Sequence, residues 1–257
     1  MIELAAQAFS LSQTWLTAAI AVFLRVGVTF TVLPGVGESF IPMRVRLGAA
    51  LGFTVIVTPA VAPELTALAE TMPPVRFFFT EAVAGFLLGI GLRLIVMALQ
   101  IAGAIAAQAT SLAQIMGGAS PDPQPAIGGI MLIAGLALAV ASGLHVHLTQ
   151  TFVSSYAVLP AGEFPLVRDT AMWGIGRIGS IFTLSFSLAA PFLIASLLYN
   201  LMLGVISKAM PQLMVAFVGA PAITWGSLFL LFLTLPFLLQ IWHDALQAGL
   251  ANPWGDI

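Results

Sequence analysis

The most suggestive chemical motif in this sequence is G-x-G-x-x-G, formed by Gly174, Gly176 and Gly179. In dinucleotide-binding enzymes the motif follows a strand and opens a helix inside a βαβ unit, where its glycines let the backbone approach a pyrophosphate. Here it precedes an apolar run long enough to cross a membrane. We therefore expect the glycines to allow close helix packing, or a flexible entry to the span, and not to bind a nucleotide.

Histidine, serine and cysteine offer no clear catalytic centre. His145 and His147 are two positions apart, so on a helix their side chains point about 200° apart and cannot chelate one metal ion well. An intramembrane serine protease needs a serine within hydrogen-bond reach of a histidine, and no nucleophile motif marks any serine here. The absence of cysteine excludes thiolate catalysis and Cys-ligated metal. The sequence therefore predicts no catalytic residues, no cofactor and no metal site.

Three charged residues interrupt apolar runs: Arg25, Glu81 and Arg93. Such residues are costly in lipid and normally face protein or a wet cavity. Glu81 and Arg93 are 12 positions apart, roughly 18 Å along a helix, so they cannot pair on one straight helix. We expect all three to be buried and to make ion pairs with neighbouring helices or partner chains that support assembly. A path for substrate or protons is the alternative interpretation.

The elements that position these residues must lie in a membrane. Only 7% of the chain is charged and 60% is hydrophobic, whereas a soluble fold is about 25% charged. A membrane-spanning helix needs about 20 apolar residues, and several charge-free stretches are longer than that. These stretches are residues 94–121, 123–162, 178–207 and 209–243.

We predict an all-α membrane protein with about six long apolar helices arranged in hairpins. The third apolar run continues to Met116, about 40 residues, which is too long for one simple crossing. A Gly/Pro-rich loop, GGASPDPQP at residues 117–125, separates it from the fourth run. The predicted spans are residues 11–33, 45–62, 75–101, 126–158, 178–203 and 212–240.

Charge also limits partners and orientation. The net charge of −2 gives no electrostatic footprint for nucleic acid, and no hydrophilic stretch is long enough for a soluble ATPase module. Basic residues favour the cytoplasmic side of a membrane. Arg44 and Arg46 follow the first span and Lys208 follows the fifth. The simplest topology therefore places both termini outside and the first, third and fifth loops in the cytoplasm. The positions of Arg76, Arg168 and Arg177 favour the opposite orientation.

The last two runs resemble a known signature. Residues 199–213, YNLMLGVISKAMPQL, resemble the hairpin of the family of the flagellar biosynthetic protein FliR and its type III secretion counterpart SctT. A Val-Gly-x-Pro element follows at residues 218–221. Further similarities are Arg25, Pro34, Gly35, Pro42, Arg44 and Arg46, then Glu81 with Gly85 and Gly89, and then Gly143, Leu144 and His145.

The resemblance implies a non-enzymatic subunit of a protein export gate in the bacterial inner membrane, at the flagellar basal body and partly raised towards the periplasm. Its partners would be FliP-like and FliQ-like subunits, an FlhB-like switch protein and unfolded exported proteins. Residues 1–175 would form a FliP-like portion and residues 176–257 a FliQ-like hairpin. A small-molecule secondary transporter, with a midplane site between broken helices, is the main alternative, and an intramembrane hydrolase is the next.

The resemblance also implies roles for two loops. Residues 115–125 would plug the pore, and the tip of the last hairpin would face the cytoplasm near the switch protein. Methionine adapts its shape readily, and glycine-rich backbone deforms, which suits a seal. The predicted plug residues are Met116, Gly117, Gly118, Pro121, Asp122 and Pro123, and the predicted tip residues are Lys208, Pro211 and Gln212.

Overall fold

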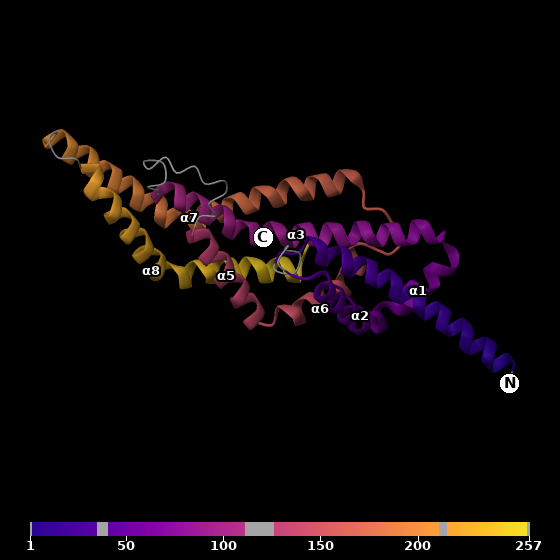
Figure 1. The fold of residues 1–257 in the computed structure, drawn as a ribbon. Helices are drawn as coiled ribbons and strands as arrows, with labels where there is room; N and C mark the ends of the chain where they lie inside the picture. Colours follow the sequence, from indigo (N-terminus) through magenta and orange to yellow (C-terminus); the bar gives the residue numbers. More distant parts are fainter. Residues whose placement is uncertain (1, 35–40, 111–125, 211–214, 256–257) are drawn as a thin grey trace. The chain divides into compact units, whose positions relative to one another are not determined.

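The computed structural model describes residues 2–34, 41–110, 126–210 and 215–255. Throughout these residues the regular structure is helical, without a strand, as Figure 1 shows. The all-α prediction is therefore confirmed. The helices are α1 (Ile2–Val32), α2 (Met43–Thr71), α3 (Pro74–Thr110), α5 (Ala126–Ala141), α6 (Leu144–Val158), α7 (Val167–Ala209) and α8 (Val215–Ala251).

Five of the described helices are long and apolar enough to cross a membrane, or up to six if one bent pair is counted as a span. By length and apolar composition, the described helices therefore confirm the prediction of about six spans. The bent pair is Ile127–Ala141 with Leu144–Val158, which meet at 75°. The sequence predicted one continuous run here. Gly143 breaks it, because its φ of 85° lies in the left-handed region that ends a helix and that favours glycine.

Several helices run past the predicted limits of their spans. α7 has 43 residues and α8 has 37, so both extend beyond the stretches needed to cross a bilayer. α2 continues through Pro59 and Pro63 to Thr71, although a helix end was expected near residue 62. Each proline removes one backbone donor but leaves the rest of the helical hydrogen bonds in place. Membrane helices tolerate such losses.

The G-x-G-x-x-G motif lies inside α7 and not at a strand-to-helix turn. This position removes the structural context that nucleotide binding requires. A side chain at Gly174, Gly176 or Gly179 would meet no other atom within 4 Å. The expected close helix approach is therefore not made at these glycines by the residues that the structure describes.

Two compact units can be recognised within the chain. One unit comprises Met1–Leu94, Gly143–Ile178 and Leu246–Ile257. In this unit α1 packs on α2, and α2 packs on α6. Phe30, Phe53 and Phe152 form its aromatic core, with ring centroids 5.1 Å apart for the first two and 6.0 Å apart for the last two. Such edge-to-face contacts stabilise more than area burial alone.

The other unit comprises Ile95–Ser142 and Gly179–Ala245. Here α3 and α5 approach closely where Gly103 faces Gly128, since a side chain at Gly103 would overlap the backbone of Gly128. Trp242 on α8 is wholly buried, and its indole Nε1 donates to the carbonyl oxygen of Ile95 at 2.9 Å. The two units are defined by which residues contact one another in the folded chain. The division into a FliP-like portion and a FliQ-like portion stays a prediction.

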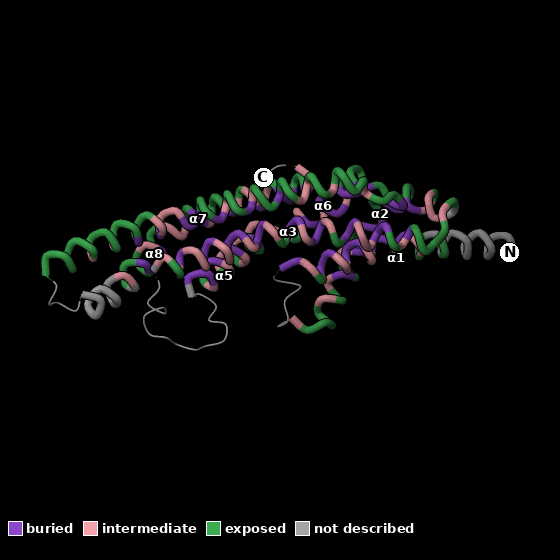
Figure 2. Tube along the Cα trace, turned by 90° about the horizontal axis from the view of Figure 1, so that it is seen from above, coloured by how far each residue is buried: buried purple, intermediate pink, exposed green. Residues whose placement is uncertain are grey.

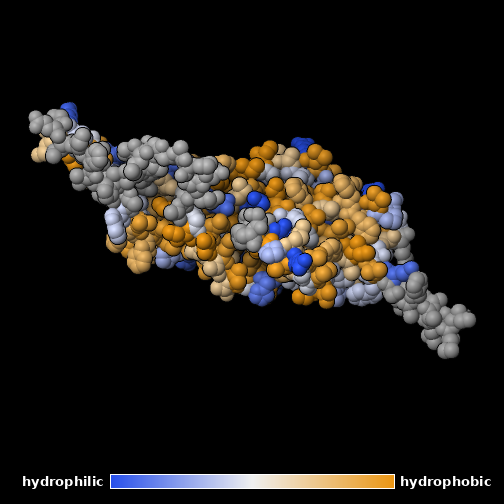
Figure 3. Space-filling model, in the orientation of Figure 1, coloured by the Kyte–Doolittle hydropathy of each residue, from blue (hydrophilic) through white to orange (hydrophobic). Residues whose placement is uncertain are grey.

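Much of the apolar surface remains uncovered. Figure 2 shows exposed residues along the C-terminal half of α7, and hydrophobic residues dominate the face drawn in Figure 3. A lipid or protein surrounding is needed to cover such side chains, because exposed apolar patches of this extent are rare on soluble monomers. Strongly exposed examples are Leu197, Leu201, Met202 and Val205 on α7, and Trp225, Phe229, Phe232 and Phe237 on α8.

Candidate functional site

A buried ion pair joins α1 to α3. Arg25 is 1% exposed and Glu81 is 0% exposed. The guanidinium Nε donates to Oε2 of Glu81 at 2.8 Å, and NH2 donates to Oε1 at 3.0 Å. This two-bond arrangement is the strongest form of an arginine–carboxylate contact. The structure therefore brings together two of the three charged residues that the sequence singled out.

The end of α6 supplies the remaining partners of this pair. NH1 of Arg25 donates to Oγ of Ser155 at 2.9 Å, and NH2 also donates to the carbonyl oxygen of Leu159 at 3.0 Å. The hydroxyl of Tyr156 donates to Oε2 of Glu81 at 3.1 Å. The guanidinium carbon lies 3.6 Å from the centre of the Tyr156 ring, a cation–π distance. The cluster of Arg25, Glu81, Ser155 and Tyr156, called here the buried charge cluster, thus ties three helices together.

Glycines let α1 and α3 approach near this cluster. A side chain at Gly85 would overlap the backbone carbonyl of Arg25, and one at Gly89 would lie 3.0 Å from the carbonyl oxygen of Thr29. Thr29 Oγ1 donates to the carbonyl oxygen of Gly85 at 2.8 Å, which fixes the contact. This G-x-x-x-G spacing therefore acts as a helix contact motif.

Arg93 differs from the prediction of a buried charge. Its side chain is exposed, and its NH1 donates to the carbonyl oxygen of Val32 in the last turn of α1 at 3.1 Å. The physical reason is its position on the helix. Twelve residues beyond Glu81 on α3, it is rotated about 120° from Glu81 around the axis, so it leaves the face that packs on Arg25. It satisfies a free carbonyl at a helix end instead.

The other predicted site residues fall mostly outside the described part of the chain. The whole plug segment, residues 115–125, lies there, and so do Pro211 and Gln212. Lys208 is described: it is exposed in the last turn of α7, where its charge complements the helix dipole. The role of residues 115–125 as a plug, and that of Lys208, Pro211 and Gln212 at the hairpin tip, stay predictions.

Sequence reasoning missed Ser155 and Tyr156. The only available signal was the polar run Ser154-Ser155-Tyr156 inside an apolar stretch, and nothing tied it to Arg25, which is 130 positions from Ser155. It also missed a second anchor. NH2 of Arg177 on α7 donates to the carbonyl oxygen of Pro253 at 3.1 Å, and NH1 donates to that of Gly255 at 3.3 Å.

Nothing in this geometry resembles a reaction centre. The guanidinium of Arg25 makes four hydrogen bonds to groups of the same chain, and these hold it in place. In the described ranges, no three side chains among His, Cys, Asp and Glu come together in a way that could hold a metal ion. The arrangement suits a fixed anchor between helices.

Comparison with known proteins gives the family. Residues 16–249 match the model of a family described as bacterial export proteins, family 1. The chain is 31% identical over 226 residues to the flagellar biosynthetic protein FliR of Caulobacter vibrioides, an alignment that covers 87% of this chain and 90% of the relative. It is 30% identical over 216 residues to FliR of Escherichia coli, covering 81% of this chain and 80% of the relative. The chain therefore belongs to the bacterial export proteins of family 1, the membrane-spanning flagellar export family that includes FliR.

Proposed function

We propose that this chain is a subunit of the flagellar protein export gate in the bacterial inner membrane, where it forms part of the pore and its plug for unfolded proteins. Membership of the FliR family gives it a role in the flagellar type III export apparatus, and that family is non-enzymatic. The finer assignment concerns the pore, the partners and the place of the complex. It is supported by the helix lengths and by the uncovered apolar surface.

One observation carries the proposal. α7 has 43 residues, which is about 65 Å of helix at 1.5 Å per residue. The hydrocarbon core of a bilayer is only about 30 Å thick. Apolar side chains nevertheless remain exposed along the second half of α7, among them Leu197, Leu201 and Val205. Lipid cannot cover so long a helix in a simple crossing, so neighbouring protein subunits are the natural cover.

The partners follow from the same reasoning together with the resemblance. FliP-like and FliQ-like subunits would cover the exposed apolar faces, an FlhB-like switch protein would lie near the tip at Lys208, and the complex would sit at the flagellar basal body, partly raised towards the periplasm. The segment 115–125 lies between α3 and α5 in the chain, and the part of α3 from Ile95 on belongs to the same compact unit as α5. The segment that connects these two helices is therefore the candidate to close the pore.

A small-molecule secondary transporter stays the second candidate because of one observation. The break between α5 and α6, bent by 75° at Gly143, resembles the discontinuous helices that bind substrate in transporters. The residues beside the break do not favour substrate binding. Ser142 Oγ donates to the carbonyl oxygen of Ala139 at 2.8 Å, and among the described residues no group of three His, Cys, Asp or Glu side chains could hold a metal ion there.

Purification separates the two candidates. We expect the tagged chain, extracted from its native membrane in mild detergent, to co-purify with several copies of other small membrane proteins. Native mass spectrometry would then report a mass far above that of the 26.9 kDa chain. A transporter would purify as a monomer or homodimer. Recovery of only those species from native membranes would refute the export-gate proposal.

A further inference from the structure

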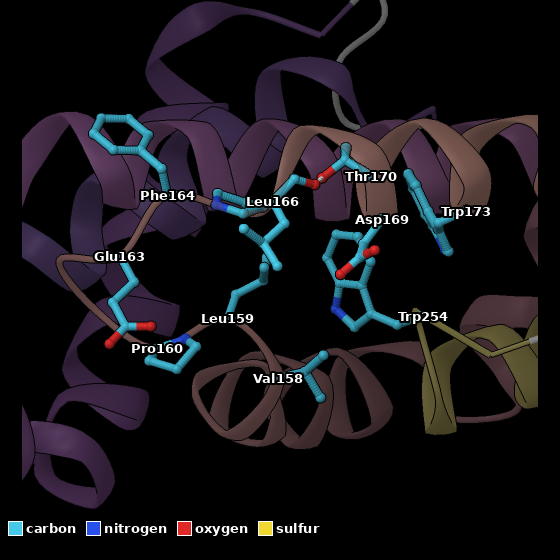
Figure 4. Close-up of a pocket in the computed structure, with 11 residues that line it drawn as sticks. Val158, Leu159, Pro160, Glu163, Phe164, Leu166, Asp169, Thr170, Trp173 and Trp254 are labelled. Carbon is cyan, nitrogen blue, oxygen red and sulfur yellow. Dashed lines mark hydrogen bonds between the residues drawn. The ribbon is translucent and has the colours of Figure 1, made fainter.

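A cavity of about 390 Å³ lies where α6 ends and α7 begins. Its walls come from the end of α6, from the segment between the two helices, from the first turns of α7, and from Trp254 near the end of the described chain, as Figure 4 shows. It contains none of the residues of the buried charge cluster. The family assignment and the proposed function leave it without a role.

One wall of the cavity is fixed in place. The rings of Trp173 and Trp254 lie 4.6 Å apart between centroids. Trp173 Nε1 donates to the carbonyl oxygen of Pro253 at 3.1 Å, and Arg177 NH2 donates to the same oxygen at 3.1 Å. A surface whose side chains are already held, Trp173 by a hydrogen bond and Trp254 by the ring contact, loses little entropy when a ligand binds.

Two carboxylates face this cavity, and the hydroxyl of Thr170, which also lines it, donates to the carbonyl oxygen of Leu166. Glu163 and Asp169 line it, and neither carboxylate makes a hydrogen bond or ion pair with the rest of the described chain. The indole Nε1 of Trp254 is buried and finds no acceptor among the described residues. Asp169 and Trp254 both line the pocket drawn in Figure 4, where their side chains overlap in the view. The two accessible carboxylates favour a ligand that brings a positive charge.

The remaining walls are apolar. Val158, Leu159, Phe164 and Leu166 line the cavity with the two tryptophans. A long basic side chain fits such a surface, because its methylene stem packs on apolar groups while its charged end reaches a carboxylate. The tryptophan faces add a cation–π contact.

We propose that this cavity, called here the acidic tryptophan pocket, binds a lysine or arginine side chain presented by a neighbouring polypeptide of the assembly. Glu163 and Asp169 pair with the cation, and the rings of Trp173 and Trp254 pack against its side chain. A phospholipid phosphate is disfavoured because two carboxylates would repel it. The inference rests on the proposed function in one respect, which is that the chain works inside an assembly.

Photo-crosslinking in the intact complex tests the pocket. A photoreactive amino acid replaces Leu166, which is 71% exposed at the rim, and the complex is irradiated after purification. We expect one main product, joined to a polypeptide segment that carries a lysine or arginine beside the attachment point. The double variant Glu163→Gln, Asp169→Asn should lower its yield by about tenfold. The matched variant Glu64→Gln neutralises an exposed carboxylate elsewhere and should leave the yield unchanged.

The outcomes distinguish this inference from the proposed function. A crosslink that is insensitive to the double substitution, a product with lipid, or no product in a complete complex would each overturn the pocket assignment and leave the export-gate proposal standing. If the chain co-purifies with no other membrane protein, both proposals fail. A charge exchange gives the final support: Asp169→Lys should lose the crosslink, and an acidic residue at the identified basic position of the partner should restore it.

Discussion

At the scale of single residues, the buried charge cluster has the largest expected effect on helix packing. Arg25 and Glu81 are removed from solvent, and each is met by more than one partner. An intact buried ion pair adds little net stability, since desolvation of both charges offsets their attraction. Loss of one partner is different, because it leaves an uncompensated charge inside the protein. The pair therefore works as a condition for correct helix packing.

We predict that Arg25→Ala impairs assembly far more than it alters conduction. Removal of the guanidinium leaves Glu81 buried without its counter-charge, at a cost of about 3–5 kcal/mol. The measurement is the yield of intact complex from membranes together with its melting temperature in detergent. Glu64→Gln, which neutralises an exposed side chain, is the control and should retain normal yield.

A double substitution sharpens this prediction. Arg25→Met with Glu81→Met removes both charges and keeps apolar volume, so it should recover part of the yield lost in Arg25→Ala. A normal yield from Arg25→Ala alone would show that the cluster is dispensable for assembly. A double variant that is no better than the single one would show that the hydrogen bonds to Ser155 and Leu159 matter more than the charge balance.

At the scale of elements, equal sequence spacing leads to unequal contacts. Gly48 and Gly52 on α2 have the same G-x-x-x-G spacing as Gly85 and Gly89 on α3. Side chains at Gly48 and Gly52 would meet no atom within 4 Å, whereas one at Gly85 would overlap the backbone of α1. The motif permits a close crossing, but tertiary packing decides which copy makes it within this chain.

This difference gives a matched pair of variants. Gly85→Ala should force α1 and α3 apart, weaken the bond from Thr29 to the Gly85 carbonyl and lower the melting temperature of the complex by several degrees. Gly48→Ala adds the same methyl group in open space of the described chain and should be neutral if no partner packs there. Equal stability of the two variants would contradict the assigned helix crossing.

Much of the element order could be predicted from the sequence, because apolar length and low charge decide where membrane helices form. The helix ends could not. α2 passes two prolines, and Gly143 breaks a run that looked continuous. The partners of Arg25 come from positions up to 134 residues away, and no local pattern encodes such pairing. Arg93 looked buried by composition, yet the helical rotation between it and Glu81 places it at the surface.

At the scale of the whole molecule, uncovered apolar length indicates an obligate assembly. The helices α3, α7 and α8 have 37, 43 and 37 residues, each longer than the roughly 20 residues that cross a bilayer. Apolar side chains such as Leu201 and Phe232 remain exposed on them. A chain that buries Arg25 and Glu81 in an ion pair and exposes so many apolar side chains is suited to be surrounded by lipid and by other subunits.

Orientation can be tested because the chain has no cysteine of its own. We predict that a cysteine at Lys208, exposed at the end of α7, is labelled by a membrane-impermeant maleimide only after the inner membrane is breached. A cysteine at Asn252, which is exposed near the predicted external terminus, should be labelled in intact cells. Labelling of the Lys208 position from the periplasm would overturn the topology, and with it the cytoplasmic hairpin tip.

The last prediction concerns closure of the pore. Residues 115–125, which lie outside the described ranges, follow an apolar helix of 37 residues and hold several glycines and prolines. Backbone of this composition keeps few hydrogen bonds of its own, so within an assembly it can lie only against protein or water. Its one charge, Asp122, then needs a wet lumen or a donor, since an unpaired carboxylate in a dry seal is too costly. Such a segment can be displaced when a polypeptide arrives.

Deletion of residues 117–120 should therefore leave the complex assembled but leaky to ions, as measured by conductance in planar bilayers and by growth. A second variant replaces the same four residues, GGAS, by another glycine, alanine and serine sequence of equal length; it keeps the reach of the loop and should stay tight. If the deletion variant assembles, stays tight and still exports protein, the segment is an ordinary turn between two spans. The comparison is decisive because the two variants differ in loop length while the helices on either side are unchanged.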